Sequence, residues 1–281
     1  MQYGYGQSGS RSGGGGARML VILGVIAFSL FGYCSKRSVN PITGETQYVS
    51  MTVDQEIALG LQAKDEMASQ YGDFEEGTAA ASLVNEVGHE LLQNSDAGRS
   101  SYRFEFHLLQ DPKTINAFAL PGGQVFITRA LLDRLQTRGQ LAGVLGHEIG
   151  HVIARHGAQQ MAKAELSQGI TGAMVMGAYD PSDPKGAAGV AMVQLISKAV
   201  NLKFGRNDEL QSDKLGVRFM SQSGYDPRAM IGVMKILEQA GGGGRQPEFF
   251  STHPNPENRI DRIKTAINEY FPNGLPSGLK P

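Results

Sequence analysis

The chain has 281 residues, of which 41% are hydrophobic, and its 26 Lys and Arg nearly balance 27 Asp and Glu to give a formal net charge of −1. This length can bury one sizeable core plus a tail, and no basic stripe marks a nucleic-acid-binding surface, so nucleic acid is excluded as a partner. The single cysteine, Cys34, excludes an intramolecular disulfide and a thiolate metal cluster.

The N-terminal region divides into a tail and an apolar segment. Residues 1–18 are rich in Gly, Ser, Gln and Tyr, which bury too little apolar surface to fold, so we expect a disordered tail. Residues 19–34 are nearly uncharged, and a helix over 19–33 would be about 22 Å long, slightly short of a hydrocarbon core of roughly 30 Å. We interpret this segment as a membrane anchor whose orientation its flanking charges leave open.

Two other interpretations of the apolar segment stay open. A cleaved signal peptide would need a small-residue cleavage site, and none of the Ala-x-Ala type is present. A lipoprotein signal would modify Cys34, but the bulky Tyr33 stands where a small residue is expected.

Residues 35–51 are interpreted as a linker, because the run from Asn40 to Glu45 contains the Pro and Gly of a turn. A folded domain is expected over residues 52–271, followed by a C-terminal tail at 272–281. Its first helix starts at Val53 with Thr52 as N-cap. Further helices are expected at residues 78–93, 128–135, 140–164, 206–221, 226–240 and 256–270. Alternating or aromatic-rich runs predict strands at residues 102–109, 115–120 and 124–128. The fold class is therefore α+β and mainly α-helical, with a small sheet preceding a long central helix.

The central helix contains the strongest chemical signal, a His-Glu-x-x-His motif formed by His147, Glu148 and His151. A four-residue step turns a helix by about 400°, so the two histidines lie on one face and can bind one ion. Glu148 lies roughly 100° round the helix from His147, where it can act as a base on a water molecule rather than as a ligand. The motif predicts a zinc hydrolase site.

A catalytic zinc site normally has three protein ligands. The metzincin pattern is excluded, since Ala154 and Gly157 occupy the positions where it needs Gly and His. His156 is interpreted as a solvated or hydrogen-bonded helix-end histidine rather than a ligand, because on the helix it would point some 140° away from His151. Glu209 and Asp213 share a helical face, so Glu209 can be the third ligand while Asp213 orients a histidine. An ordinary acidic helix surface is the alternative.

In these motifs the chain resembles the gluzincin metallopeptidases of the family that includes the CAAX prenyl protease type I, HtpX and the periplasmic quality-control proteases of the BepA and LoiP type. The resemblance covers most of residues 40–270. It rests on Asn116–Gly123, the helix from His147 to His156, Glu209–Gly216, and Ser251–Pro254 followed by Arg259.

The resemblance implies a zincin-like fold and one Zn²⁺ per chain, bound by His147, His151 and Glu209. Glu148 would be the base, Asp213 would orient a ligand, and His253 and Arg259 would lie near the oxyanion. The strand with Asn116, Ala117 and Phe118 would bind extended substrate by adding it to the sheet edge. A plain hairpin is the alternative for this strand.

The function predicted by this resemblance is a zinc endopeptidase that clears misfolded or misassembled envelope proteins, anchored to a membrane with its catalytic domain outside the cytoplasm. A membrane-tethered chaperone that rarely cleaves is the alternative, although a pure binder has no need of Glu148. We further hypothesise that His253 can occupy the open metal position and silence the enzyme. The sequence does not indicate an oligomeric state.

Overall fold

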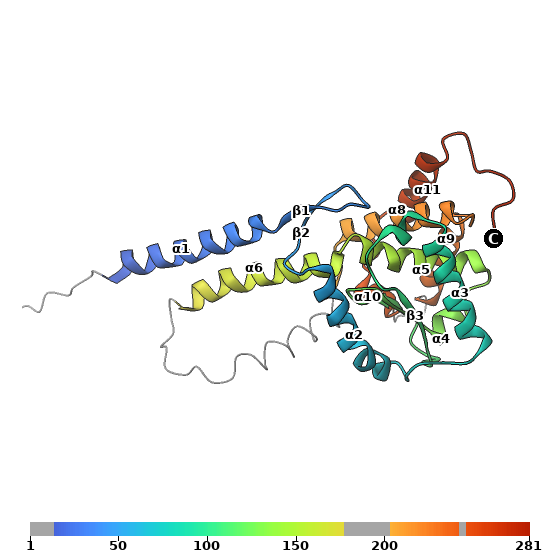
Figure 1. The fold of residues 1–281 in the computed structure, drawn as a ribbon, viewed down its shortest axis with the longest axis horizontal. Helices are drawn as coiled ribbons and strands as arrows, with labels where there is room; N and C mark the ends of the chain where they lie inside the picture. Colours follow the sequence, from blue (N-terminus) through green and yellow to red (C-terminus); the bar gives the residue numbers. More distant parts are fainter. Residues whose placement is uncertain (1–13, 177–202, 242–245) are drawn as a thin grey trace, which may run out of the picture.

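The computed structural model describes residues 14–176, 203–241 and 246–281. Residues 1–13 of the predicted tail therefore lie outside the described residues. Figure 1 shows a helical domain from which a long arm of two helices projects. The domain helices among the described residues are α2 (Val53–Gln70), α3 (Ala79–Gln93), η1 (Asp96–Arg99), α4 (Arg129–Leu132), α5 (Arg138–Ile153), α8 (Arg206–Gln222), α9 (Ala229–Ala240), α10 (Phe249–Thr252) and α11 (Arg259–Tyr270). The predicted α+β, mainly helical class is confirmed.

The predicted sheet is present beside the central helix. It contains β3 (Glu105–Leu109), β4 (Ala117–Ala119) and β5 (Gln124–Thr128) in the order β3-β5-β4. Strand β5 lies in the middle, parallel to β3 and antiparallel to β4. All residues of β5 are buried, as expected of a strand that is covered on both faces.

Local capping explains where the first two domain helices start. The Thr52 side chain accepts from the backbone of Gln55, whose own side chain accepts in return from Thr52, which completes a capping box. Thr78 caps α3 through the backbone N–H of Ala81. The predicted start of the first helix, with Thr52 as N-cap, is confirmed.

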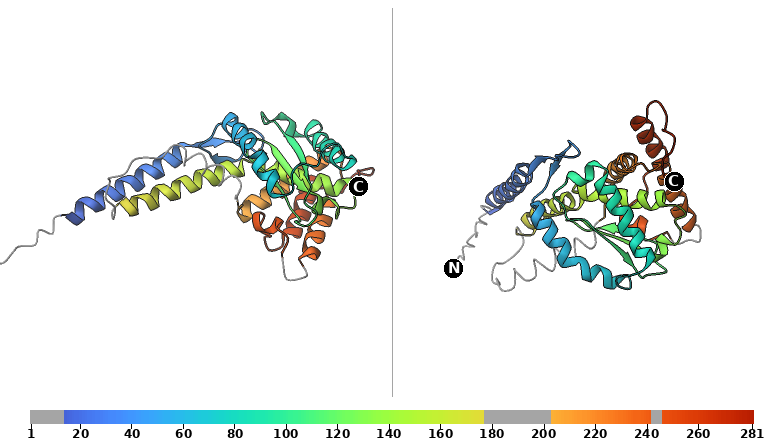
Figure 2. Two further views of the ribbon diagram at one scale, coloured as in Figure 1. Left: turned by 90° about the horizontal axis from the view of Figure 1, so that it is seen from below. Right: turned by 45° about the vertical axis from the view of Figure 1, so that its right-hand side comes forward.

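Helix α5 forms the centre of the core. Every residue from 139 to 153 is buried, and the helix contacts α3, α8, α9 and β4. The second view of Figure 2 shows the other domain helices arranged around it. A helix with this environment must bury its polar residues too, and such burial is costly unless those groups find partners.

The predicted long helix over residues 140–164 is interrupted. Helix α5 ends at Ile153, Arg155 takes a left-handed φ of 58°, and a second helix, α6 (His156–Met176), starts at the next residue. The prediction of one continuous helix is therefore wrong at this point. No local residue marks the break, since non-glycine residues rarely adopt positive φ.

The arm consists of α6 and α1 (Gly14–Ser35), which lie side by side in Figures 1 and 2. Helix α1 begins inside the predicted tail, at residue 14 instead of 19, since extending an existing helix gains a hydrogen bond for each added residue. Lys36 pairs with Glu165 of α6 at 2.7 Å. Across the described residues no helix is at once long and apolar enough to cross a membrane, so the predicted transmembrane span is not confirmed.

The predicted linker at residues 35–51 and the predicted C-terminal tail at residues 272–281 both have regular backbone pairing. In the linker, β1 (Arg37–Val39) and β2 (Thr46–Tyr48) form an antiparallel hairpin whose turn is closed by the Asn40 side chain. In the C-terminal segment, the Lys280 backbone pairs with Gly224 and Asp226, because this segment runs beside the loop before α9.

Candidate metal centre

The structure brings together the residues predicted for catalysis and metal binding, although they come from four elements. Helix α5 supplies three, α8 supplies two, the residue after α10 supplies one and the first residue of α11 supplies one. In that order they are His147, Glu148, His151, Glu209, Asp213, His253 and Arg259.

Small residues allow α5 and α8 to approach closely. A Cβ at Gly150 would lie 2.7 Å from the Ser212 hydroxyl, and one at Gly216 would lie 3.2 Å from the backbone nitrogen of His147. The Ser212 hydroxyl donates to the His147 carbonyl at 2.6 Å. This close contact brings a carboxylate of α8 within reach of the two histidines of α5.

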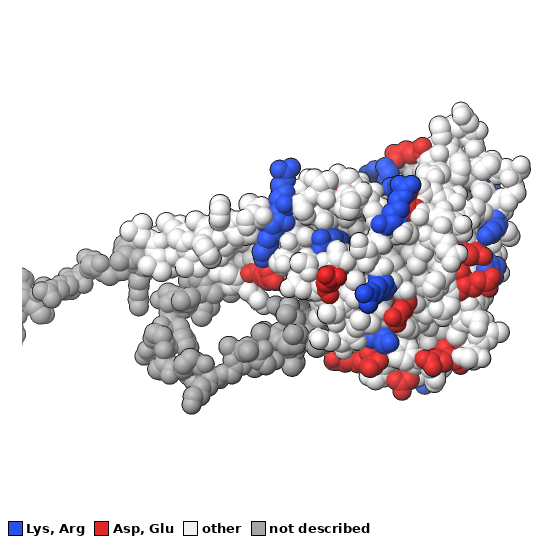
Figure 3. Space-filling view, viewed as in Figure 1, with Lys and Arg blue, Asp and Glu red and all other residues white. Residues whose placement is uncertain are grey.

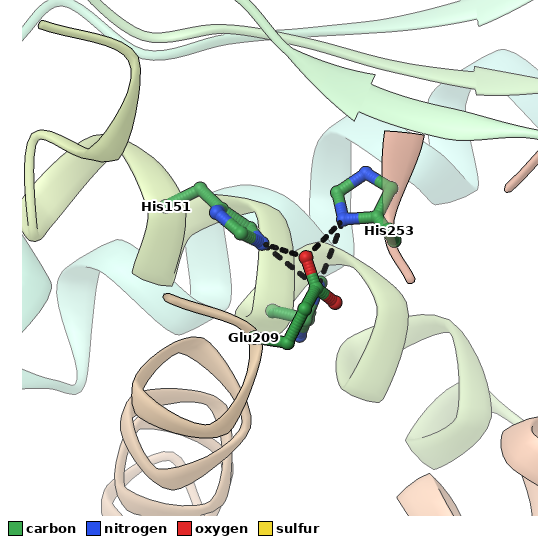
Figure 4. A group of neighbouring side chains, drawn as sticks. His151, Glu209 and His253 are labelled. Atoms are coloured by element: carbon green, nitrogen blue, oxygen red, sulfur yellow. Dashed lines mark hydrogen bonds and ion pairs between the residues drawn. The ribbon is translucent and has the colours of Figure 1, made fainter. Parts of the chain in front are cut away.

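Four side chains converge on one point, and Figure 4 shows three of them, His151, Glu209 and His253. Nε2 of His147 and Nε2 of His151 are 3.0 Å apart, and they lie 3.5 Å and 3.4 Å from the two carboxylate oxygens of Glu209. Nδ1 of His253 lies 3.2 Å from Oε1 of Glu209. One potential ligand atom from each residue falls within 4.8 Å of every other, which is compact enough for a single metal ion.

Unsatisfied polar atoms in this cluster also fit a metal and its substrate. Both carboxylate oxygens of Glu148, Oε2 of Glu209 and Nε2 of His253 are buried without a hydrogen-bond partner among the described residues. Buried polar groups are rarely left unpaired, and such exceptions point to a bound ion or a catalytic role. The residues present therefore fit a divalent cation with nitrogen and oxygen ligands.

The electrostatics of the cluster favour a positive charge at its centre. Burial opposes protonation of His147, but Asp213 and Glu209 outweigh it and raise the pKa of His147 to about 9. Burial lowers the pKa of His151 well below its ordinary value, which favours the neutral imidazole that binds metals. Burial alone would raise the pKa of Glu209, but His253 and the other two histidines hold it well below the usual range. The centre thus favours a positive charge beside an ionised carboxylate, and a metal ion that binds there would displace the proton of His147.

Glu148 differs from the other carboxylates of the site. Burial raises its pKa, and the nearby His253 and His147 oppose that rise only partly. Its Oε1 lies 3.6 Å from Nε2 of His253. A carboxylate with a raised pKa and free oxygens is suited to accept a proton near neutral pH.

Asp213 contacts His147, one of the two histidines of the motif. Its Oδ1 lies 2.9 Å from Nδ1 of His147, and the carboxylate receives two hydrogen bonds of 2.8 Å from Arg259. Nη1 of Arg259 also lies 3.2 Å from Oε2 of Glu209. Arg259 therefore faces the two acids rather than open space.

His156 is a hydrogen-bonded histidine at a helix end, as predicted, but the expectation that it points away from His151 is wrong. This side chain is 1% exposed, and its Nδ1 lies 2.9 Å from Nδ1 of His151. The left-handed Arg155 interrupts the helix between His151 and His156, so the angle expected on a continuous helix does not apply. The same interpretation also missed Gln211, whose Oε1 lies 2.7 Å from Nε2 of His156.

The predicted substrate strand lies next to the metal centre. Strand β4, with Ala117 and Phe118, is at one edge of the sheet and contacts α5 and α10. Asn116 precedes it, with a buried side-chain oxygen that has no partner among the described residues.

The fold and the donor set are those of a zincin-like metallopeptidase with a His-Glu-x-x-His helix and a glutamate on a second helix. The family comparison makes the assignment specific: the chain belongs to peptidase family M48, whose model matches residues 79–267. The family resemblance expected from the sequence motifs is confirmed.

Relatives of known name support the same assignment. The chain is 29% identical to the beta-barrel assembly-enhancing protease of Yersinia pestis, over 83% of this chain and 48% of that protein. It is 30% identical to the mitochondrial metalloendopeptidase OMA1 of Schizosaccharomyces pombe, over 82% and 66%. It is 31% identical to the beta-barrel assembly-enhancing protease of Escherichia coli, over 67% and 39%. The chain thus spans between about two fifths and two thirds of these proteins.

Proposed function

We propose that this chain is a zinc endopeptidase that cleaves misfolded or misassembled proteins of the cell envelope. The observation that carries the proposal is the convergence of His147, His151 and Glu209 on one point, together with a Glu148 carboxylate that has no hydrogen-bond partner among the described residues. Nitrogen and oxygen ligands of this kind suit Zn²⁺, and no thiolate is needed.

When bound by these three residues, zinc would lower the pKa of a water molecule, so that the water could lose a proton near neutral pH and attack a peptide carbonyl. Glu148 accepts the proton of that water on a carboxylate oxygen and then delivers it to the amide nitrogen of the departing peptide. Nε2 of His253 is free to donate a hydrogen bond to the oxyanion that forms on the carbonyl.

The contacts of Arg259 support a role different from the oxyanion contact expected from the sequence. Its guanidinium is bonded to Asp213 and paired with Glu209. Arg259 balances the two buried negative charges, so its effect on catalysis is exerted through the ligands.

The regulatory hypothesis for His253 gains support from its other ring nitrogen. Nδ1 of His253 lies 3.3 Å from Nε2 of His147 and is one of the atoms that converge in the cluster. In a resting state His253 would act as a fourth ligand. His253→Ala should then raise self-cleavage, whereas a purely catalytic role predicts only lower casein turnover.

Extended substrate would bind along β4. An edge strand has backbone groups available for another chain, and the strand lies against both the metal helix and α10. Residues Asn116, Ala117 and Phe118 would supply these backbone contacts, whose orientation would bring the scissile bond to Glu148.

Membrane attachment would occur through α1, with the catalytic domain on the extracytoplasmic side. The helix exposes large apolar side chains, including Leu20 (71%), Phe28 (76%) and Phe31 (74%). Figure 3 shows the outer part of the arm without charged side chains on the face drawn. Such a surface favours an apolar environment over water. Co-sedimentation with membranes after carbonate washing, compared with a variant that carries Ser at these three positions, tests this assignment.

The central experiment compares Glu148→Gln with the wild type. The variant keeps the ligands but loses the proton acceptor, so we expect normal zinc content and casein cleavage reduced by a factor of about 10² or more. Glu257→Gln, the same change at an exposed position, is the matched control. A chelator should abolish wild-type cleavage.

A Glu148→Gln variant that binds zinc and retains near-normal turnover would refute the role of the base. If the wild type binds unfolded casein without cleaving it even with zinc present, the chain is a chaperone and the proposal fails.

A further inference from the structure

The two histidines of α5 that are predicted to bind the metal through Nε2 have different hydrogen-bond partners at Nδ1. His147 contacts a carboxylate, whereas His151 contacts the neutral ring of His156, which in turn contacts the amide of Gln211. His151 and His156 are both nearly fully buried. Water therefore cannot readily replace this pair of contacts.

The hydrogen-bond roles along this chain are fixed by chemistry. A histidine that offers Nε2 to a metal carries its proton on Nδ1. Nδ1 of His151 then donates to Nδ1 of His156, at 2.9 Å. His156 must hold its own proton on Nε2, where it donates to Oε1 of Gln211 at 2.7 Å. Every group has one compatible role, and no charge is required.

Aromatic packing fixes the plane of the His151 ring but does not determine which edge of the ring faces the metal position. Phe204 stacks on this ring with centroids 3.9 Å apart and an interplanar angle of 28°. Stacking restricts the plane of a ring without selecting which edge faces the metal. The hydrogen bond from Nδ1 supplies that selection.

The position of His156 depends on the break between α5 and α6. Arg155, in its left-handed conformation, bonds the buried carboxylate of Glu56 and donates to the Met51 carbonyl at 2.6 Å. Asn40 donates to the carbonyl of Ile153 at 2.7 Å, which satisfies the end of α5. Contacts from distant parts of the chain thus maintain the break that turns His156 toward His151.

We infer that His156 and Gln211 are positioning residues that fix the tautomer and orientation of His151 and thereby set the affinity for the metal. This inference rests on the proposed function, since it requires a metal at the cluster. Partners of this kind behind a ligating histidine typically contribute 10-fold to 100-fold in metal affinity.

The test measures Zn²⁺ affinity of the full chain by competition with a chromophoric chelator. His156→Leu removes the acceptor while filling the space, so we expect affinity to fall by about 10-fold to 100-fold. His156→Asn carries an amide oxygen at the place of Nδ1, so it should recover most of that loss. Gln211→Met, at a half-buried position, should show a smaller loss in the same direction.

A second readout separates positioning from folding. The melting temperature of the chelator-treated protein should be similar in all variants, whereas the rise caused by adding Zn²⁺ should shrink in His156→Leu. His89→Leu, at an exposed histidine of α3, is the control and should match the wild type in both.

Equal affinity in His156→Leu and wild type would overturn the inference, and so would an equal loss in the Leu and Asn variants. If His156→Leu does not fold, the other two variants decide. Unchanged Zn²⁺ affinity in Gln211→Met, together with a full loss of Zn²⁺ affinity in His156→Asn, would also overturn the inference. A wild type that does not bind Zn²⁺ at all would overturn the proposed function and this inference together.

Discussion

His147 and His151 lie one turn apart on the same buried helix, but their supports differ in charge. Behind His147 lies an ionic pair, in which Arg259 holds the carboxylate of Asp213 with two hydrogen bonds of 2.8 Å. Behind His151 lies the neutral pair of His156 and Gln211. We refer to these two arrangements as the ionic support and the neutral support.

Both supports orient a histidine, but they differ in how much stability the protein would lose if one partner were removed. The ionic support places full charges at positions that are almost inaccessible to water, where each charge is costly without its partner. Burial raises the pKa of the Asp213 carboxyl, but Arg259 and His147 outweigh it and keep the pKa below its usual range. The neutral support carries no such charges. We therefore expect defects in the ionic support to reduce stability, and defects in the neutral support to reduce mainly metal affinity.

The largest expected effect is on stability when the ionic support loses its cation. Arg259→Met leaves the carboxylates of Asp213 and Glu209 buried without their counter-charge, so the free energy of unfolding should fall by about 3–5 kcal/mol. Urea unfolding with chelator present measures this without a contribution from metal. A loss below about 1 kcal/mol would show that the buried charges are not balanced by Arg259.

A smaller effect is expected when the charge of Asp213 is removed but its shape is kept. Asp213→Asn should lower Zn²⁺ affinity by about 10-fold to 100-fold, because an amide orients His147 less firmly than a carboxylate. Chelator competition measures the affinity, and Asp261→Asn, an exposed acid of α11, is the control. An unchanged affinity would mean that the ionic support serves folding alone.

The neutral support can be tested through the backbone break on which it depends. Arg155→Ala and Arg155→Gly both remove the contacts to Glu56, but only Ala retains the cost of a φ of 58°. Arg155→Gly should therefore be more stable than Arg155→Ala by about 1 kcal/mol. Thermal unfolding of the two variants gives the difference, and an Ala variant of equal or greater stability would indicate a continuous helix.

The smallest effect is expected from an exposed ion pair between α8 and α11, the two helices that the pair of Asp213 and Arg259 also joins. Lys214 follows Asp213 on α8 and pairs with Glu269 of α11 at 2.7 Å, with both side chains largely exposed. Lys214→Met should change the free energy of unfolding by less than about 1 kcal/mol. Urea unfolding beside Arg259→Met provides the comparison, and similar losses in both would contradict the distinction between buried and exposed charges.

Local patterns predicted much of the fold. The Thr52 cap, the three strands and the first part of the central helix depend on neighbours within a few residues, so they can be read from the sequence. The linker was harder, because the turn at Asn40 was visible but the pairing of β1 with β2 was not. Strands of three residues carry too little alternation to be recognised.

The sequence by itself determined the catalytic motif, since a four-residue spacing places His147 and His151 on one face and Glu209 and Asp213 on another helix. Only the tertiary structure decided which residues contact Nδ1 of each histidine. His156 reaches His151 because Arg155 breaks the helix, and Arg155 is held by Glu56, 99 residues earlier in the chain. A positive φ at a non-glycine residue is imposed by distant contacts rather than by local preference, so no nearby residue could have predicted the neutral support.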